Sequence, residues 1–157
     1  MKAIIVIHSQ SGHTVALARA IGEELRKSGH EVDIELLRIR GAAKPGSSNF
    51  ELRNAPDVSS YDMVLVGGPV WGFSASPVVM KFLRDLDGLK GKKAVAFATK
   101  GLPFQWTGGV QALRKMMESL ELSGADVVEG EAVWYFFSGN QARIDQAAQR
   151  ITERLKQ

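Results

Sequence analysis

The stretch from Ala3 to Thr14, AIIVIHSQSGHT, constrains the fold of this chain more than any other. Ala3 to Ile7 is an apolar run without alternation, as expected of a central strand that is covered on both faces. The strand ends at His8, and a short turn leads into a helix that begins near His13 or Thr14. The pattern therefore predicts a buried strand, a tight turn and a helix, in that order.

The turn itself has the composition of an anion site. Its backbone N–H groups point outward, hydroxyls can add donors, and the dipole of the following helix favours negative charge. Three hydroxyls are available, from Ser9, Ser11 and Thr14. No lysine or arginine lies in the turn, so neutral donors would hold a phosphate there. The alternative is an ordinary joint between strand and helix, capped by Ser11 or Thr14.

Length and composition limit the class of protein. A chain of 157 residues is expected to form one domain, residues 1–157, with a single well-filled core. No apolar stretch approaches the length of a membrane span or resembles a signal peptide, so we expect a cytoplasmic protein without a membrane span. The absence of cysteine excludes disulfides, thiolate nucleophiles and iron–sulfur ligation within this chain. Any redox chemistry must come from a bound cofactor.

The charge pattern does not suggest a nucleic-acid partner. Twenty Lys and Arg against 17 Asp and Glu make the chain mildly basic. These charges are scattered, and the densest cluster is Lys90, Lys92 and Lys93. Nucleic-acid binding calls for a basic stripe with interleaved aromatic residues, so we expect no nucleic-acid binding.

Strands and helices alternate along the whole chain. Strands are expected at 3–7, 31–36, 63–66, 94–98 and within 126–137, the last of them bent around Gly130. Helices are expected at 14–27, after Ser76-Pro77, after Gly109, and from about 140 to 155. The helix after Gly109 is expected to bury Val110, Leu113, Met117 and Leu120. The segment 40–60 is expected to be a crossover with one short helix around 49–54.

The order of the strands follows from their burial patterns. The strand at 31–36 alternates strictly and is expected at a sheet edge, whereas the first, third and fourth are apolar throughout. Right-handed crossovers then give an open parallel α/β sheet of order 2-1-3-4-5 with helices on both faces. A ligand site is expected at the switch point between the first and third strands. Three loops meet there: Ser9–Thr14, Pro69–Ser76 and Thr99–Thr107.

Aromatic residues in these loops indicate the shape of the ligand. The second loop contains Trp71 and Phe73, and the third contains Phe104 and Trp106. A simple connection needs no such rings, so they favour a flat ligand held by stacking. The alternative is that these rings only cover the top of the sheet.

Several α/β classes are excluded by missing motifs. The chain has neither a G-x-G-x-x-G dinucleotide fingerprint nor a P-loop. A phospho-acceptor receiver would need carboxylates where this chain has His8-Ser9 and Gly67-Gly68. No residue qualifies as a catalytic acid, base or nucleophile. His8 and His13 lack an accompanying carboxylate or thiol, so no metal site is predicted.

The sequence resembles flavodoxins and flavodoxin-like FMN proteins. The pattern Ser9-x-Ser11-Gly12-x-Thr14 after an apolar strand is similar to the phosphate loop of that family. Tyr61-Asp62 followed by MVLVGGPVWG, with Ser-Pro opening the next helix, looks like the family's second flavin loop. The resemblance implies a flavodoxin-like three-layer sandwich around a five-stranded parallel sheet. It also implies FMN as cofactor, with its phosphate in Ser9–Thr14 and its isoalloxazine between the other two loops.

The resemblance also implies a role in FMN binding for individual residues of the three loops. Hydroxyls of Ser9, Ser11 and Thr14, and backbone amides of Gly12 and His13, would bind the phosphate. Trp71 and Trp106 are the stacking candidates, with Phe104 and Phe73 as substitutes, and the backbone at Gly72 would approach the flavin N5 edge. The complete set of expected cofactor-binding residues is Ser9, Gln10, Ser11, Gly12, His13, Thr14, Pro69, Val70, Trp71, Gly72, Phe73, Thr99, Lys100, Gly101, Phe104 and Trp106.

The chain also departs from the family pattern. His13 stands where asparagine is common, and the third loop lacks the acidic residue and the tyrosine often seen in flavodoxins, which leaves the second stacking ring open. Lys100 could place a positive charge near the flavin or a redox partner. Flavodoxins are usually acidic, whereas this chain is basic.

Three functions are compatible with these features. In the first, the chain is an electron carrier that delivers electrons from FMN to a redox partner protein. In the second, it is an NAD(P)H-dependent FMN oxidoreductase acting on quinones or similar acceptors, which the basic surface mildly favours. In the third, the domain binds no flavin and acts as an interaction module.

Overall fold

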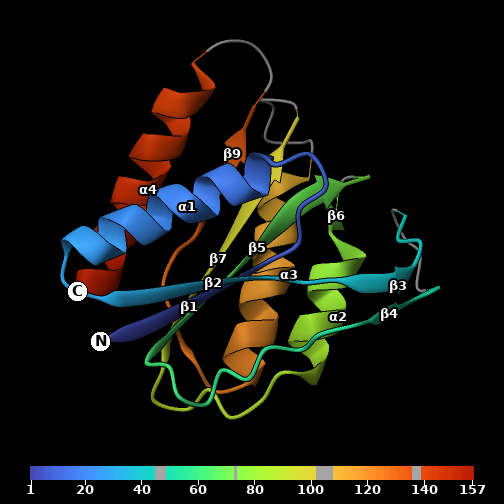
Figure 1. Cartoon of the computed structure of the whole chain (residues 1–157), viewed down its shortest axis with the longest axis horizontal. Coiled ribbons are helices and arrows are strands. Elements are labelled where there is room, and N and C mark those ends of the chain that lie inside the picture. The colour runs from blue at the N-terminus through green and yellow to red at the C-terminus, as the bar shows by residue number, and fades with distance from the viewer. Residues whose placement is uncertain (45–48, 73, 102–107, 136–138) are drawn as a thin grey trace.

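A central parallel sheet organises the computed structural model, which describes residues 1–44, 49–72, 74–101, 108–135 and 139–157 (Figure 1). The sheet has the order β2-β1-β5-β7-β8, with β9 continuing the edge beside β7. These strands are β1 (Lys2–Ile7), β2 (Glu31–Leu36), β5 (Met63–Trp71), β7 (Lys93–Lys100), β8 (Asp126–Val127) and β9 (Glu131–Trp134). Because β5 and β7 are the third and fourth predicted strands, the predicted order 2-1-3-4-5 is confirmed, as is β2 at the edge.

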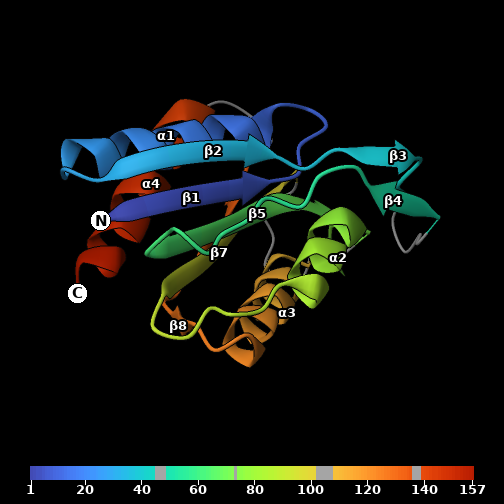
Figure 2. The same ribbon diagram turned by 60° about the horizontal axis from the view of Figure 1, so that its bottom comes forward.

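Helices cover both faces of this sheet. They are α1 (His13–Lys27), α2 (Pro77–Asp85), α3 (Gly109–Leu122) and α4 (Asn140–Lys156). Figure 2 shows α1 and α4 on one face and α2 and α3 on the other. Side chains of β1 alternate between the two layers: Ile5 packs in the core under α1 and α4, and Ile4 in the core over α2 and α3. The predicted three-layer α/β sandwich is therefore confirmed.

Two adjacent glycines of β5 leave room for large neighbouring side chains, one from β7 and one from α2. A Cβ atom on Gly67 would lie 2.1 Å from the ring of Phe97. A Cβ atom on Gly68 would lie 2.5 Å from Cγ2 of Val79 on α2. Both distances are far below van der Waals contact, so neither position accepts a side chain without displacement of its neighbour. The sequence predicted a strand that ends at Val66, before these glycines. In the structure, β5 continues through both of them to Trp71.

The last strand is interrupted at Gly130, as predicted. β8 pairs with β7 at Lys93 and Ala94, and β9 pairs with β7 from Phe97 onward. Between these two pairings, a Cβ on Gly130 would lie 1.6 Å from the carbonyl oxygen of Ala96. The backbone at this point approaches β7 so closely that only glycine fits.

The crossover after β2 differs from the prediction. Residues 49–54 contain no helix; instead β4 (Phe50–Leu52) pairs antiparallel with β3 (Ile39–Gly41). Phe50 is buried and its neighbour Glu51 is exposed, which is the alternation of a strand. Three residues are too few for a periodic signal, and β4 is defined by its pairing with β3, the preceding strand of the chain. The hairpin lies near α2 (Figure 1).

The buried face of α3 was predicted only in part. Leu120 is buried as expected, and Leu113 and Met117 are partly buried and pack against the core. The fully buried residues besides Leu120 are Gly109, Ala112 and Met116. Val110 is 48% exposed, so its predicted burial is wrong. Two adjacent rows of side chains on α3 recur at helical spacing. The row that contains Gly109 and Ala112 faces the sheet most directly because its small side chains allow closer packing.

At the end of the sheet opposite the three loops, lysine side chains donate hydrogen bonds to backbone carbonyl groups. Nζ of Lys92 donates to the carbonyl oxygens of Ser59 and Tyr61, and Nζ of Lys93 donates to the carbonyl oxygens of Leu155 and Gln157. These contacts place the predicted lysine cluster at the amino ends of the strands. Within the described ranges, no helix is long and apolar enough to cross a membrane.

We predict that Gly67→Ala lowers the free energy of unfolding by about 1–3 kcal/mol or more, because the new methyl group overlaps the buried Phe97 ring. Urea denaturation measures the loss. Gly22→Ala is the matched control: it lies in α1, its nearest contact would be 3.4 Å from Ile34, and alanine favours the helix by up to about 1 kcal/mol. Equal stability of Gly67→Ala and the unmodified chain would contradict this packing.

Candidate functional site

The three predicted loops begin at neighbouring points of the sheet. The registers pair Ile7 with Gly67 and Pro69 with Thr99, so the carboxyl ends of β1, β5 and β7 lie side by side. The backbone N–H of His8 extends this pairing by donating to the carbonyl oxygen of Gly67 at 3.1 Å. This edge is the switch point of the sheet, where α/β folds place their ligands.

The loop after β1 has the features of an anion site. Gly12 occupies the N-cap position of α1 in a left-handed conformation, with φ of 88°. Within the part of the chain that the structure describes, no side chain caps this helix by a hydrogen bond, and no acidic residue lies in its first turn. The alternative of a helix capped by Ser11 or Thr14 is therefore not what the structure shows. The first-turn N–H groups and the helix dipole remain available to a negatively charged group.

Donors within this loop are partly engaged already. The N–H of Gly12 donates to Oγ of Ser9 at 3.2 Å, whereas Gln10 and Ser11 are exposed. Among the described residues, no heavy atom lies within 4 Å of the place where a Cβ of Gly12 would be, so these residues leave that side of the turn open. An open turn with neutral donors and an uncapped helix fits a phosphate group such as that of FMN.

Thr14 links the first loop to the third. Its Oγ1 lies 2.8 Å from Oγ1 of Thr99, and both residues are buried. One hydroxyl of this pair donates to the other. Thr14 therefore has a proton for a phosphate only when Thr99 is the donor in the pair.

The second loop is a tight hairpin rather than an irregular connection. β6 (Ser74–Ala75) folds back antiparallel on β5, so that Trp71 pairs with Ser74. Gly72 at the turn has φ of 53°, a conformation that favours glycine. Pro69, Val70 and Trp71 are half-buried. Trp71 thus lies at the end of an ordered strand, and Phe73 lies outside the described residues.

His8 connects the first loop to this hairpin. Its Nδ1 lies 2.7 Å from Oγ of Ser76, the N-cap residue of α2. Its ring meets the Trp71 ring edge to face, with centroids 5.1 Å apart and an interplanar angle of 79°. Burial lowers the pKa of His8, because desolvation disfavours the imidazolium form. The imidazole is therefore neutral at neutral pH.

The third loop is described only at its start. Lys100 ends β7 and is 7% exposed, and burial lowers its pKa. Its side chain lies against the first turn of α3, where a Cβ on Gly109 would be 3.1 Å from Lys100 Nζ. Phe104 and Trp106, the other expected ring-stacking residues, lie outside the described residues.

Tyr135 covers the beginning of that loop. It follows β9, and its N–H donates to the carbonyl oxygen of Lys100 at 3.0 Å. Its ring stacks on His13 with centroids 3.7 Å apart and an interplanar angle of 10°. A Cβ on Gly101 would lie 3.9 Å from the Tyr135 hydroxyl. Tyr135 therefore borders both the first and the third loop.

The contacts of His8 and Tyr135 are not predicted by the sequence. Neither residue is among the expected cofactor-binding residues, yet both lie beside the loops of the site. The position of His8 directly after the first strand is a signal that it faces the site, whereas the position of Tyr135 depends on the bend at Gly130. Among the described residues, no group of three His, Asp or Glu side chains is placed to hold a metal ion.

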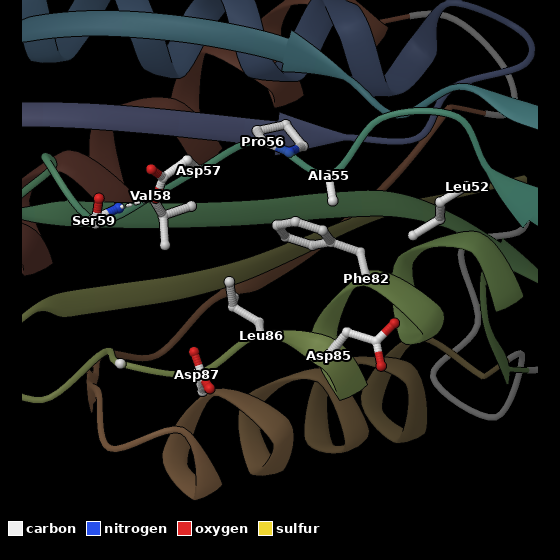
Figure 3. A pocket seen from close by; sticks show the side chains of 11 residues that line it. Leu52, Ala55, Pro56, Asp57, Val58, Ser59, Phe82, Asp85, Leu86 and Asp87 are labelled. Carbon is white, nitrogen blue, oxygen red and sulfur yellow. Dashed lines mark hydrogen bonds between the residues drawn. The ribbon is translucent and has the colours of Figure 1, made fainter.

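A hollow of about 310 Å³ lies elsewhere, between α2 and the segment that precedes β5 (Figure 3). Phe82, Leu86 and Val58 contribute apolar surface, and Asp85 and Asp87 lie at its edge. None of the predicted cofactor-binding residues that the structure describes lines it, so we assign the candidate site to the three loops and not to this hollow.

We predict that the stability of the cofactor-free protein depends on His8 as the pH falls below about 6.5. A lowered folded-state pKa means that the unfolded chain binds a proton first as the pH falls. The unfolding free energy therefore decreases below about pH 6.5, by at most about 1.4 kcal/mol per pH unit from this group. Urea denaturation across this range measures the slope, which becomes shallower in His8→Asn. Identical slopes in both proteins would contradict this role of His8.

Comparisons with known proteins agree with the predicted family and with the fold. The family model described as a flavodoxin domain matches residues 4–135. A flavodoxin from Megasphaera elsdenii is 32% identical over 127 residues, which cover 79% of this chain and 80% of that protein. An NAD(P)H dehydrogenase (quinone) from Rhodopseudomonas palustris is 30% identical over 161 residues, covering 92% of this chain and 76% of that protein.

The structural comparison extends over the whole chain. The crystal structure of oxidised flavodoxin 1 from Bacillus cereus superposes with a TM-score of 0.72 and 23% identity, covering 99% of this chain and 98% of that one. At this identity, the likeness shows the shared fold. Together with the family match over most of the sequence, these findings show that the chain belongs to the flavodoxin family of FMN-binding redox proteins.

Proposed function

We propose that this chain is a single-domain electron carrier that passes electrons from bound FMN to a redox partner protein. The observation that carries the proposal is the uncapped first turn of α1 beside the Trp71 hairpin. An anion site and an aromatic ring lie at neighbouring strand ends, as a ligand with a phosphate and a flat ring requires. The 32% identity to a flavodoxin over most of both chains supports a carrier.

Within this proposal, the first loop holds the phosphate of FMN. Ser9, Ser11 and Thr14 contribute hydroxyls, and Gly12 and His13 contribute backbone amides. Gln10 completes the exposed turn.

The remaining contacts come from the other two loops. Trp71 packs on the isoalloxazine ring from one side, with Pro69, Val70 and Gly72 around it. Thr99, Lys100 and Gly101 border the ring from β7. The second aromatic side chain that stacks on the isoalloxazine is Trp106 or Phe104. Phe73 is the substitute for Trp71. Bound FMN supplies one- and two-electron redox chemistry, and these residues bind and orient it.

A second candidate function is supported by specific observations. The quinone dehydrogenase of Rhodopseudomonas palustris is 30% identical over 92% of this chain. The chain is basic overall, and Lys100 lies at the carboxyl end of β7. Positive charge attracts anionic pyridine nucleotides, so we keep an NAD(P)H-dependent oxidoreductase acting on quinones as the alternative.

We predict that Ser11→Ala weakens FMN binding by about tenfold or more and leaves riboflavin binding unchanged, because only FMN carries the phosphate. Fluorescence titration of the cofactor-free protein measures both dissociation constants. Ser28→Ala, which removes an exposed hydroxyl at the other end of α1, is the matched control. Equal losses for FMN and riboflavin would place the phosphate elsewhere.

The two functions are separated by adding NADH or NADPH to the FMN-loaded protein without oxygen. A carrier keeps its visible absorbance for hours with either nucleotide and loses it when dithionite is added. Bleaching within minutes by one nucleotide, followed by recovery when a quinone is added, would instead establish the oxidoreductase. A purified protein that neither contains nor takes up FMN would overturn both.

A further inference from the structure

The side chain of His8 is fixed from two directions. It is 6% exposed, and its Nδ1 shares a hydrogen bond of 2.7 Å with Oγ of Ser76. Oγ of Ser76 also accepts from the N–H of Val78 at 3.2 Å, which caps α2. Because the Ser76 backbone N–H donates to the carbonyl oxygen of Pro69, the same residue is tied to β5 as well. The plane of the imidazole is therefore set by the start of α2 and not by the loop in which His8 lies.

The fixed imidazole faces the ring that is proposed to pack on FMN. The edge-to-face geometry, with a 79° angle and a centroid distance of 5.1 Å, is a favourable arrangement for two aromatic rings. The backbone of Trp71 is held by its pairing with Ser74, whose Oγ donates to the Trp71 carbonyl oxygen at 3.2 Å. Backbone pairing does not choose the side-chain rotamer of a half-buried tryptophan at the end of a hairpin. The contact with His8 can do so.

We propose that His8 is a positioning residue of the flavin site: anchored by Ser76, its imidazole holds the Trp71 ring in the orientation that receives the isoalloxazine. The inference rests on the proposed FMN site and adds to it a residue that touches Trp71 instead of the cofactor. Preorganisation of a binding ring lowers the entropy lost when the ligand binds. His8 thus contributes to affinity for the ring part of FMN, and the phosphate contacts are independent of it.

Two variants separate the hydrogen bond from the ring. His8→Asn keeps a polar side chain that can bond Ser76 but removes the ring that faces Trp71. His8→Phe keeps a ring and removes the hydrogen bond. We expect each variant to weaken binding by roughly three- to tenfold. Within each variant, the factor is the same for FMN and for riboflavin. His30→Asn, the same change at the turn after α1, is the matched control and leaves both affinities unchanged.

A double-mutant cycle with Trp71→Leu tests whether His8 acts through Trp71. We expect the loss caused by His8→Asn to shrink to less than about twofold once Trp71 is absent. The same loss in both backgrounds would overturn the proposal, as would a loss confined to FMN, which would mean that His8 supports the phosphate loop. Unchanged affinities in both His8 variants would overturn it too.

A measurement without cofactor keeps the inference distinct from the proposed function. The near-UV circular dichroism of the empty protein contains a contribution from Trp71, obtained by subtracting the spectrum of Trp71→Leu. We expect His8→Asn to lose most of that contribution and to keep its far-UV spectrum and cooperative unfolding. If the Trp71 signal survives the loss of His8, the positioning role fails even when FMN binds. If the Trp71 signal is lost in His8→Asn but neither the unmodified protein nor any variant binds FMN, the proposed function fails instead.

Discussion

The structure depends on close packing against two glycines of the central strand β5, one on each face of the sheet. At Gly67 the ring of Phe97 occupies the space of a missing side chain, and at Gly68 the side chain of Val79 does the same from the opposite face. Neither glycine can carry a side chain without displacing a buried neighbour. The strand continues past both glycines to Trp71, where the second loop begins.

The candidate site is held together by the loop after β1, which contacts each of the other segments. His8 reaches Ser76 and Trp71, Thr14 reaches Thr99, and His13 stacks on Tyr135. Each contact uses a side chain, so backbone donors in the first turn of α1 stay available to an anion. The loop can therefore fix its surroundings and offer a binding surface at the same time.

Much of the fold could be predicted because its signals are local. Apolar runs such as 3–7 and the alternation at 31–36 each indicate a strand and its place in the sheet, and Gly130 marked the bend of the last strand. The inward face of α3 could be chosen from periodicity only in part, since Ala112 and Met116 have the same helical spacing as Leu113 and Met117. The strand at Phe50–Leu52 has only three residues and is defined by its pairing with β3.

The loops of the site could be located from the sequence, but their contacts could not. His8 and Ser76 lie 68 residues apart, and a single polar residue at a strand end has no periodicity that reveals its partner. Tyr135 reaches His13 only because the last strand bends. The cofactor contacts of the loop residues remain predictions, and Phe104, Trp106 and Phe73 lie outside the described residues.

The two edges of the sheet affect whether the chain aggregates at high concentration. An exposed, regular edge strand can pair with another molecule and begin aggregation. On one side, β2 carries the exposed acidic residues Glu31, Asp33 and Glu35. On the other, the break at Gly130 divides the edge into β8 and β9, of two and four residues. Repulsion protects one edge and irregularity protects the other, so the chain resists intermolecular strand pairing whether or not its cofactor is bound.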